Sequence, residues 1–337
     1  MNRRSTALSA VFVASLIIAV WALTAVEAWG QGDVRFTSVS MRRDYWTVER
    51  LRSARPLPLP LVRNLDRDAQ TGPGVVSRDY GTAGLDFSST RVVPEDARLS
   101  YPYSTIGKLF FTIGADAFIC SGAVISSRIV LAAAHCVYDE VTDEFFSDFL
   151  FVPAYFEGEE APFDTWSVNM AFVPSVWADG DGVPNRGDFA VLLMDDLEGQ
   201  KIGDVTGWLG YDLRTLVDNH VTMFGYPGNH DRGERMHQVN TGDWFDFGDN
   251  TVAYGSDMGG GSSGGPWVEN FGRRAEGQTH GKNGKQNRVV GVTSFGFDDE
   301  AVRVQGSSVL DARFKEVFNT ACRQAAGNCR NKGKPHS

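Results

Sequence analysis

Cysteine, histidine and long apolar runs are all scarce in this chain. Four of the 337 residues are cysteine and six are histidine, and the histidines do not recur at the spacing of metal ligands. After residue 25, no stretch is apolar over the roughly 20 residues that a membrane-spanning helix needs. The sequence therefore predicts no metal site and no membrane span beyond the N-terminus. We expect His230 and His237 to be polar surface residues.

Lysine is absent between residues 29 and 91, where ten arginines stand against seven acidic residues and the net charge is +3. From residue 92 to the end the balance reverses, with 20 basic and 34 acidic residues and a net charge of −14. An acidic surface repels phosphate backbones, so nucleic acid is not expected as a partner. The 37 glycines favour turn-rich β structure over helical bundles.

The N-terminus has the pattern of a secretory signal. Arg3 and Arg4 precede an apolar run over residues 7–25, and Val26-Glu27-Ala28 supplies small residues at the positions that signal peptidase reads. This predicts a signal peptide over residues 1–28, a secreted (extracellular or periplasmic) protein, and no stable membrane association after cleavage. The alternative is a retained membrane anchor. No cysteine follows the apolar run, which argues against a lipid anchor.

Export makes disulfides the expected state of the four cysteines. Of the three possible pairings we predict Cys120–Cys136 and Cys322–Cys329, because each pair brackets a short local loop. The second pair cannot bridge within one regular helix, since seven residues rise about 10.5 Å. Gly327-Asn328 can end that helix and let the chain fold back.

Residues 29–91 differ from the remainder of the chain. Pro56-Leu57-Pro58-Leu59-Pro60 excludes a regular helix or a central strand. We predict a pro-segment or N-terminal extension, and the alternative is an unstructured leader without a role. Removal after export is expected between Arg78 and Val92, with Arg91-Val92 as the first candidate bond. The opposite charges suggest that the segment lies on the acidic domain until it is cut.

Residues 92–337 have the pattern of one all-β domain. Short apolar and β-branched runs alternate with glycine and Asp/Asn turns, which is typical of barrels and sandwiches, and no internal repeat is visible. The expected strands are Ile106–Ile113, Ala117–Ile125, Arg128–Ala133, Phe189–Met194, His220–Tyr226, Val289–Phe295 and Val302–Leu310. An amphipathic C-terminal helix is predicted by the helical spacing of Leu310, Phe314, Val317, Phe318 and Ala321.

Three short motifs, far apart in the sequence, contain the residue types of a serine hydrolase. Leu131–Cys136 holds a histidine after an apolar strand, Gly187–Leu193 holds an aspartate before an apolar run, and Gly261–Pro266 holds a serine in a glycine-rich turn. Each motif alone is weak. Their order and rough spacing are those of one serine-protease arrangement.

A serine hydroxyl becomes a good nucleophile only beside a base that a third group orients. We predict Ser263 as the nucleophile, His135 as the base and Asp188 as the orienting group. Gly261 can adopt backbone angles closed to other residues. Its N–H and that of Ser263 can therefore converge on a developing oxyanion. This chemistry needs no cofactor.

The three motifs resemble the TAAHC, DIALL and GDSGGP segments of the trypsin/chymotrypsin-fold serine proteases. Within that family the chain is most similar to the secreted bacterial glutamyl endopeptidase (V8-like) branch. The added likeness lies in Tyr101–Gly107, in Gly225–Gly228 and in Gly259-Gly260 before the serine segment. It covers about residues 92–320.

The resemblance implies a fold of two antiparallel six-stranded β-barrels followed by a C-terminal helix. His135 and Asp188 would come from the first barrel and Ser263 from the second. The substrates would be proteins or peptides, and we expect the enzyme to be a monomer. Four residues would form the strand that pairs with the substrate backbone, namely Thr293, Ser294, Phe295 and Gly296.

Three departures from the family pattern affect activation and specificity. Ser262 stands where trypsin-like members carry the aspartate that receives a new N-terminus, so that switch does not carry over. Thr293 stands where glutamyl endopeptidases place a glutamate-binding histidine. Asp257 lies six residues before Ser263, where trypsins hold the acid that binds Lys or Arg, although aspartate also occurs there in glutamyl-specific relatives. Cleavage after Lys or Arg is our working hypothesis, and Glu is the alternative.

Two other functions compete with this reading. Gly261–Gly265 also satisfies G-x-S-x-G, but the esterase fold with that motif needs its acid and histidine after the serine. Only His280 and His336 follow Ser263, and no strand–helix alternation surrounds the motif. The second alternative is a catalytically inactive protease homologue that acts as a binding module. Such proteins usually lose a triad residue, and none is lost here.

Overall fold

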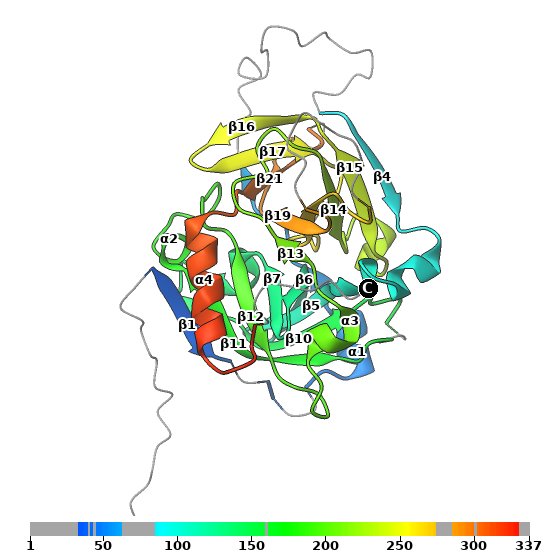
Figure 1. Ribbon diagram of the computed structural model, residues 1–337, viewed down its shortest axis with the longest axis vertical. Helices are drawn as coiled ribbons and strands as arrows, with labels where there is room; N and C mark the ends of the chain where they lie inside the picture. Colours follow the sequence, from blue (N-terminus) through cyan, green and yellow to red (C-terminus); the bar gives the residue numbers. More distant parts are fainter. Residues whose placement is uncertain are drawn as a thin grey trace, which may run out of the picture.

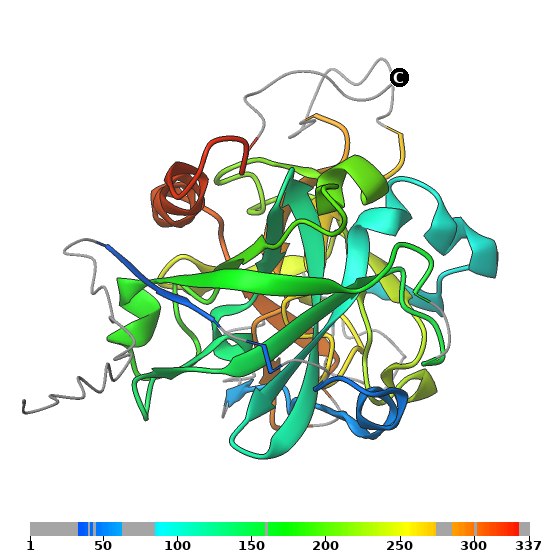
Figure 2. The same ribbon diagram turned by 90° about the horizontal axis from the view of Figure 1, so that it is seen from below.

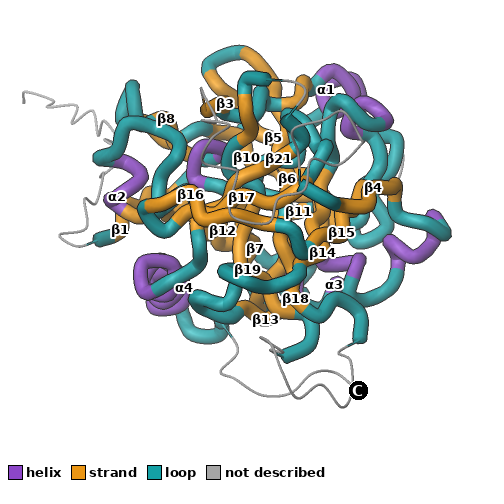
Figure 3. The backbone as a smooth tube through the Cα atoms, turned by 90° about the horizontal axis from the view of Figure 1, so that it is seen from above, coloured by secondary structure: helices purple, strands orange, loops and turns teal. Residues whose placement is uncertain are grey.

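The computed structural model describes residues 33–39, 41–42, 45–62, 85–158, 161–273, 285–299 and 302–329. The predicted signal peptide, residues 1–28, lies outside these ranges. Strands dominate, and the helices are short and lie at the periphery (Figure 1, Figure 3). Within these ranges, none of the helices combines the length and the apolar character that crossing a bilayer requires.

The first barrel is closed. Six of the eight strands in its sheet follow the order β11-β10-β5-β6-β7-β12, and β12 pairs back to β11. Its interior is packed with fully buried side chains such as Phe110, Phe151 and Val191. The strands of this sheet are β1 (Val34–Ser38), β2 (Arg55–Pro56), β5 (Ile106–Ile113), β6 (Asp116–Ser126), β7 (Ile129–Ala132), β10 (Ser147–Pro153), β11 (Trp166–Pro174) and β12 (Ala190–Met194).

The second unit has its own core around Met223, Tyr254 and Trp267 but is divided into two sheets. The larger sheet has the order β13-β19-β18-β14-β15-β4 and the smaller one β16-β17-β21. Where the two sheets meet, a side chain takes the place of a backbone partner: the N–H of Val292 donates to Ser307 Oγ (3.0 Å). The strands are β4 (Phe87–Arg91), β13 (Gly210–Tyr211), β14 (Val221–Gly225), β15 (His237–Thr241), β16 (Trp244–Gly248), β17 (Thr251–Gly255), β18 (Pro266–Glu269), β19 (Arg288–Val292) and β21 (Val304–Ser308).

Two short strand pairs and a few helices complete the described structure. The pairs are β3 (Leu61–Val62) with β20 (Gly296–Phe297), and β8 (Tyr138–Asp139) with β9 (Glu144–Phe145). The helices are α1 (Val48–Ser53), α2 (Ser175–Ala178), α3 (Ile202–Thr206) and α4 (Ala312–Arg323), with 3-10 turns at Glu95–Leu99, Tyr103–Thr105, Ala134–Cys136 and Asp231–Gly233.

The predicted C-terminal helix is present as α4. The Asp311 side chain caps its first turn by accepting from the N–H of Arg313 (2.9 Å). Phe314, Val317 and Ala321 are its buried face, and the Phe314 ring packs edge-on against Phe189 beside β12 (5.6 Å between centroids). The mostly β fold with a C-terminal helix is thus confirmed, with one barrel fully closed and the second unit built from two sheets.

Both predicted disulfides are confirmed. Cys120–Cys136 joins β6 to the turn after β7 with 6.3 Å between Cα atoms. Cys322–Cys329 joins the end of α4 to the loop that folds back from it, with 5.4 Å between Cα atoms. Gly327 has a φ of +84°, the left-handed conformation that lets the chain reverse there.

The described parts of residues 29–91 lie on the domain, mostly as strands. β1 pairs with β11 (Figure 1, and blue beside green in Figure 2), and β4 pairs with β15 over five residues. Arginines of this segment contact acids of the domain. The ion pairs are Arg35 with Asp143 and Asp179, Arg42 with Asp148, Arg55 with Asp116 and Arg91 with Asp231. These contacts match the predicted charge attraction, and an unstructured leader does not fit the described parts.

Candidate active site

The histidine turn and the aspartate meet at the end of the first barrel. β7 and β12 are paired, so the residues that follow β7 and precede β12 lie at one edge. His135 Nδ1 lies 2.8 Å from Asp188 Oδ2, and the His135 backbone N–H donates to Asp188 Oδ1 (3.0 Å). A carboxylate only accepts hydrogen bonds, so Nδ1 carries the proton and Nε2 keeps its lone pair. His135 is therefore oriented as a base.

Asp188 is fully buried and fixed by hydroxyl groups from the second unit. Ser294 Oγ donates to Asp188 Oδ2, and the Asp188 N–H donates to Ser308 Oγ (3.1 Å). Ser294 was predicted to lie in the strand that pairs with the substrate backbone, and its side-chain hydroxyl contacts the acid that was predicted for the triad. Ser308, at the end of β21, was not predicted at all.

The nucleophile turn packs directly against the histidine turn. A side chain at Gly264 would lie 2.7 Å from the backbone nitrogen of Ala133 and 2.5 Å from the carbonyl oxygen of Ser121. Gly261 has a φ of +89° and Gly264 a φ of +76°, so two glycines supply the backbone angles that the turn needs. The structure thus brings the three predicted motifs together.

Ser121 holds this turn in place through hydrogen bonds, and the sequence analysis did not predict this role. Its N–H donates to the carbonyl of Ser263 (2.7 Å), and its hydroxyl donates to the carbonyl of Gly261 (2.8 Å). The same hydroxyl accepts from the N–H of Tyr226 (2.9 Å). The signal that could have found it is its position directly after Cys120.

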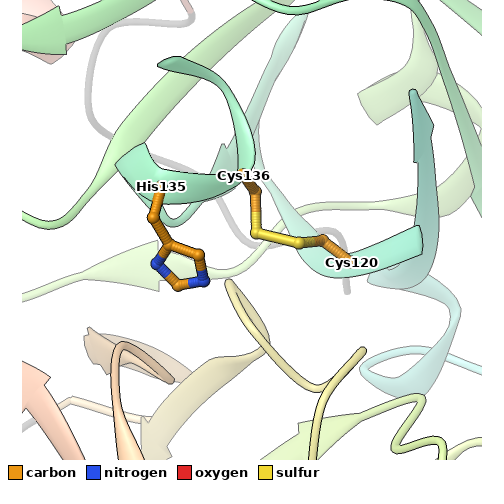
Figure 4. Close-up of side chains that lie close together, drawn as sticks. All are labelled: Cys120, His135 and Cys136. Carbon is orange, nitrogen blue, oxygen red and sulfur yellow. A yellow bond between two sulfur atoms is a disulfide. The ribbon is translucent and has the colours of Figure 1, made fainter. Parts of the chain in front are cut away.

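The disulfide restricts the turn that carries the base. Figure 4 shows the His135 imidazole and the Cys120–Cys136 bridge leaving the same short turn. These three residues are also close enough to resemble a ligand set for a metal. Both sulfurs are bonded to each other, so neither can act as a thiolate ligand.

The two reacting atoms are buried. Ser263 Oγ and His135 Nε2 are inaccessible to solvent, and neither has a hydrogen-bond partner among the described residues. The bond between the nucleophile and the base is thus not formed in this structure. Catalytic hydrogen bonds are often long before substrate binds, so this geometry is compatible with the predicted roles.

The predicted oxyanion donor is occupied by another part of the chain. The Gly261 N–H donates to the carbonyl of Leu57 (3.0 Å), and the Gly296 N–H donates to the carbonyl of Pro60 (2.9 Å). Gly296 was predicted to pair with the substrate backbone, and in the structure it pairs with the backbone of Pro60. Residues 55–62 thus contact both the oxyanion turn and the predicted substrate strand.

Two of the remaining predicted substrate-binding residues are buried in the second unit. Thr293 is fully buried and accepts from the indole N–H of Trp267 (2.9 Å). Phe295 is fully buried, and a side chain at Gly306 would lie 2.0 Å from its ring. Their contacts are therefore with the core.

Asp257 is paired with a histidine that the sequence did not indicate. His230 Nε2 lies 3.2 Å from Asp257 Oδ2, while Asp257 Oδ1 is buried without a hydrogen-bond partner. The His230 ring stacks on His237, which in turn contacts Asp231 (2.8 Å). Burial lowers the pKa of His237, although Asp231 opposes this shift. The expectation that these histidines are surface residues is wrong for His237, which is buried.

The fold and the geometry of the site together define the class of protein. A closed barrel joined to a second β unit, with a histidine–aspartate pair from the first beside a serine turn from the second, is the chymotrypsin-like serine protease arrangement. The chain has this fold and is similar to its glutamyl endopeptidase (V8-like) branch. The similarity to particular proteins agrees with this assignment.

Glutamyl endopeptidase of Bacillus licheniformis is 28% identical over 201 residues, which cover 56% of this chain and 57% of the relative. The chain thus spans little more than half of that relative's length. Protease Anisep from Arthrobacter nicotinovorans is 27% identical with a TM-score of 0.55, covering 66% of this chain and 96% of that structure. A Glu endopeptidase structure, at 24% identity and a TM-score of 0.56, covers 71% and 98% and shares the fold. No protein-family model matches.

Proposed function

We propose that this protein is a secreted serine endopeptidase that hydrolyses peptide bonds through an acyl-enzyme. The observation that carries the proposal is the buried His135–Asp188 pair, which lies beside the glycine turn of Ser263. Similarity to a protein named glutamyl endopeptidase and to another named protease supports it. Secretion is supported by the signal-like N-terminus and by two disulfides, which persist in oxidising compartments.

Each residue has a distinct role in the proposed reaction. Ser263 attacks the scissile carbonyl, while His135 Nε2 takes the hydroxyl proton and later returns it to the leaving amine. Asp188 holds the imidazole in the required tautomer and stabilises the imidazolium. The N–H groups of Gly261 and Ser263 donate to the oxyanion. No step in this scheme draws on a metal or a cofactor.

The proposed side-chain preference is Lys or Arg, with Glu as the alternative. Asp257 Oδ1 is buried and has no hydrogen-bond partner within the described ranges, so this carboxylate oxygen can still accept a hydrogen bond. A cationic side chain supplies both donors and the opposite charge. Two of the similar proteins are named as glutamyl endopeptidases, which keeps the acidic preference as the competitor.

Covalent labelling tests the proposed activity. A serine-directed phosphonate should label Ser263, and Ser263→Ala should abolish the label and lower turnover by roughly 10⁶-fold. His135→Ala should lower turnover comparably, and the double variant should be little worse, because the triad acts as a unit.

Ser262→Ala is the adjacent-hydroxyl control and should still be labelled. The Ser262 hydroxyl bonds to Gly259 and Gln305, so we expect this variant to lose about 1–3 kcal/mol of stability. A Ser263→Ala protein with near-normal turnover would refute the proposal. Failure of the wild-type protein to react at all would favour an inactive homologue that acts as a binding module.

A further inference from the structure

Residues 55–62 pass the predicted active-site turn as one continuous segment that begins and ends in a two-residue strand, and this segment is called the strand below. At one end, Arg55-Pro56 (β2) pairs in parallel with Phe118-Ile119 of β6. At the other, Leu61-Val62 (β3) pairs in parallel with Gly296-Phe297 (β20). The eight residues therefore bridge the first barrel and the second unit, passing over the turn that carries the nucleophile.

The centre of the strand binds where a reacting carbonyl is expected. The Leu57 carbonyl accepts from the Gly261 N–H (3.0 Å), and the Leu57 N–H donates to the carbonyl of Ile119 (3.0 Å). One of the two predicted oxyanion donors is therefore already in use. The Gly296 N–H donates to the Pro60 carbonyl (2.9 Å), and the Asp298 N–H donates to the Val62 carbonyl (3.3 Å). The contacts are those of a bound peptide backbone.

Glycines line the cleft where the strand touches it. A side chain at Gly260 would lie 2.6 Å from the Leu57 oxygen and 3.2 Å from the Pro58 Cα. At Gly228 it would lie 2.5 Å from Pro56 Cγ, and at Gly296 it would lie 2.7 Å from a Leu59 methyl group. Any side chain at these positions would collide with the strand. The strand therefore lies directly on the backbone of the turn that precedes Ser263.

The atoms predicted to react are buried in this arrangement. Among the described residues, Ser263 Oγ and His135 Nε2 have no hydrogen-bond partner, although buried polar atoms are normally paired. Residues 57–59 contact Gly260 and Gly261, which come just before Ser262 and Ser263 in the chain. The strand therefore occupies a predicted oxyanion donor beside the predicted nucleophile.

The alternating prolines suit a ligand that binds without being cut. Pro56, Pro58 and Pro60 lack an N–H and have a fixed φ, so the strand is preformed and loses little entropy when it binds. The bond after the Leu57 carbonyl leads to the nitrogen of Pro58. The proline ring crowds this nitrogen, which His135 would have to protonate for cleavage.

We propose that residues 55–62 are an internal inhibitor that occupies the substrate cleft and keeps the protease inactive until the strand is displaced. This inference rests on the proposed function, because it assigns a regulator to the same site. The ligand class is an extended, proline-rich peptide bound by backbone hydrogen bonds. The ion pairs of Arg42 and Arg55 with acids of the first barrel hold the flanking chain in place.

The test measures labelling of Ser263 by a serine-directed fluorophosphonate, read by intact-mass spectrometry of the exported chain. Full-length and shortened chains differ in mass, so the label on each is measured in the same sample. Only molecules with the strand displaced can react. With about 0.1–10% of molecules open, full-length chains should react at least 10-fold more slowly than shortened ones.

Two matched substitutions distinguish an effect of the strand from a general effect on the enzyme. Leu57→Asp places a charge in the strand, and we expect labelling of the full-length chain to accelerate at least 10-fold. Val48→Asp introduces the same charge at an exposed position of α1 and should leave the rate unchanged. A synthetic peptide of residues 55–62 should slow labelling of the Leu57→Asp chain and remain intact, whereas the peptide with its three prolines changed to alanine should inhibit less.

The outcomes distinguish the two proposals. If full-length wild-type chains are labelled as fast as shortened or Leu57→Asp chains, the strand does not inhibit, while the protease assignment stands. Cleavage within residues 55–62 would show that the strand is a substrate and would overturn the inhibitor role. Absence of label on every chain would overturn the protease assignment itself. The wild-type comparison remains decisive even if Leu57→Asp does not fold.

Discussion

Ser294 donates its hydroxyl to Oδ2 of Asp188, the same oxygen that faces Nδ1 of His135. The triad acid comes from the first barrel and this hydroxyl from the second unit, so the contact ties the two halves of the active site together. A hydrogen bond to a charged group is worth about 1.5–3 kcal/mol. Ser294 is therefore placed to hold the acid in position.

Removal of this hydroxyl should affect the chemical step more than binding. We expect Ser294→Ala to lower kcat by roughly 10-fold or more, since 1.4 kcal/mol corresponds to a factor of 10, and to leave KM nearly unchanged. Steady-state kinetics on a peptide substrate measures kcat and KM separately. If KM rises and kcat does not fall, Ser294 binds substrate as the sequence suggested. Ser294→Thr retains the hydroxyl and should recover part of the rate.

The two disulfides should differ in their effect on activity. The Cys120–Cys136 loop spans 16 residues, and removing that bridge should cost about 3 kcal/mol of stability in the chain-entropy model. Because Cys136 follows the base directly, we also expect kcat to fall in Cys120→Ala/Cys136→Ala. The control, Cys322→Ala/Cys329→Ala, should lose about 2 kcal/mol and keep its kcat. Denaturant unfolding and kinetics of both variants provide the check, and equal kcat values would contradict the prediction.

Asp257 should determine the preference for the substrate side chain that precedes the scissile bond. We expect the wild-type protein to cleave matched peptides with Arg at this position faster than those with Glu or Phe, because a carboxylate attracts a cation and repels an acid. Asp257→Ser should reduce the Arg/Glu ratio of kcat/KM at least 10-fold. If the Arg/Glu ratio is unchanged, Asp257 has a structural role and does not determine specificity.

His230 provides the second arm of the specificity test. Its Nε2 lies 3.2 Å from Asp257 Oδ2, so the imidazole competes with a substrate cation for this carboxylate. His230→Ala removes that competitor, and the Arg/Glu ratio should then rise. If wild-type protein cleaves fastest after Glu, the glutamyl alternative is correct and another group must bind the acid.

We expect the pro-segment to be cleaved upstream of Arg91-Val92, the bond that the sequence indicated first. Arg91 ends a strand whose five residues are all paired, and the Val92 N–H donates to the carbonyl of Met236 (2.9 Å). A protease needs an accessible, extended bond, so the paired Arg91-Val92 bond is protected. We expect the new N-terminus between residues 79 and 85. N-terminal sequencing of the secreted protein will identify it, and an active protein that begins at Trp29 would show that the segment is retained.

The local sequence determined the strands, the helix and the short disulfide loops. The run Ile106–Ile113 is a strand with the predicted bounds, because its apolar and β-branched residues are buried along the barrel wall. The run at Val289–Phe295 is different: β19 ends at Val292, and the next three residues leave the sheet. Their backbone and side chains instead contact the nucleophile turn, Trp267 and Asp188.

By itself the sequence also predicted a histidine, an aspartate and a serine, in that order, as the catalytic residues, because an activated serine needs a base and an orienting group. Only the tertiary structure decided how they are supported and covered. Ser121 and Ser294 act across the two halves, and Leu57 reaches Gly261 from some 200 residues away. The sequence placed the proline-rich run only within a pro-segment or N-terminal extension, because its contacts are with partners distant in the chain and no local pattern encodes them.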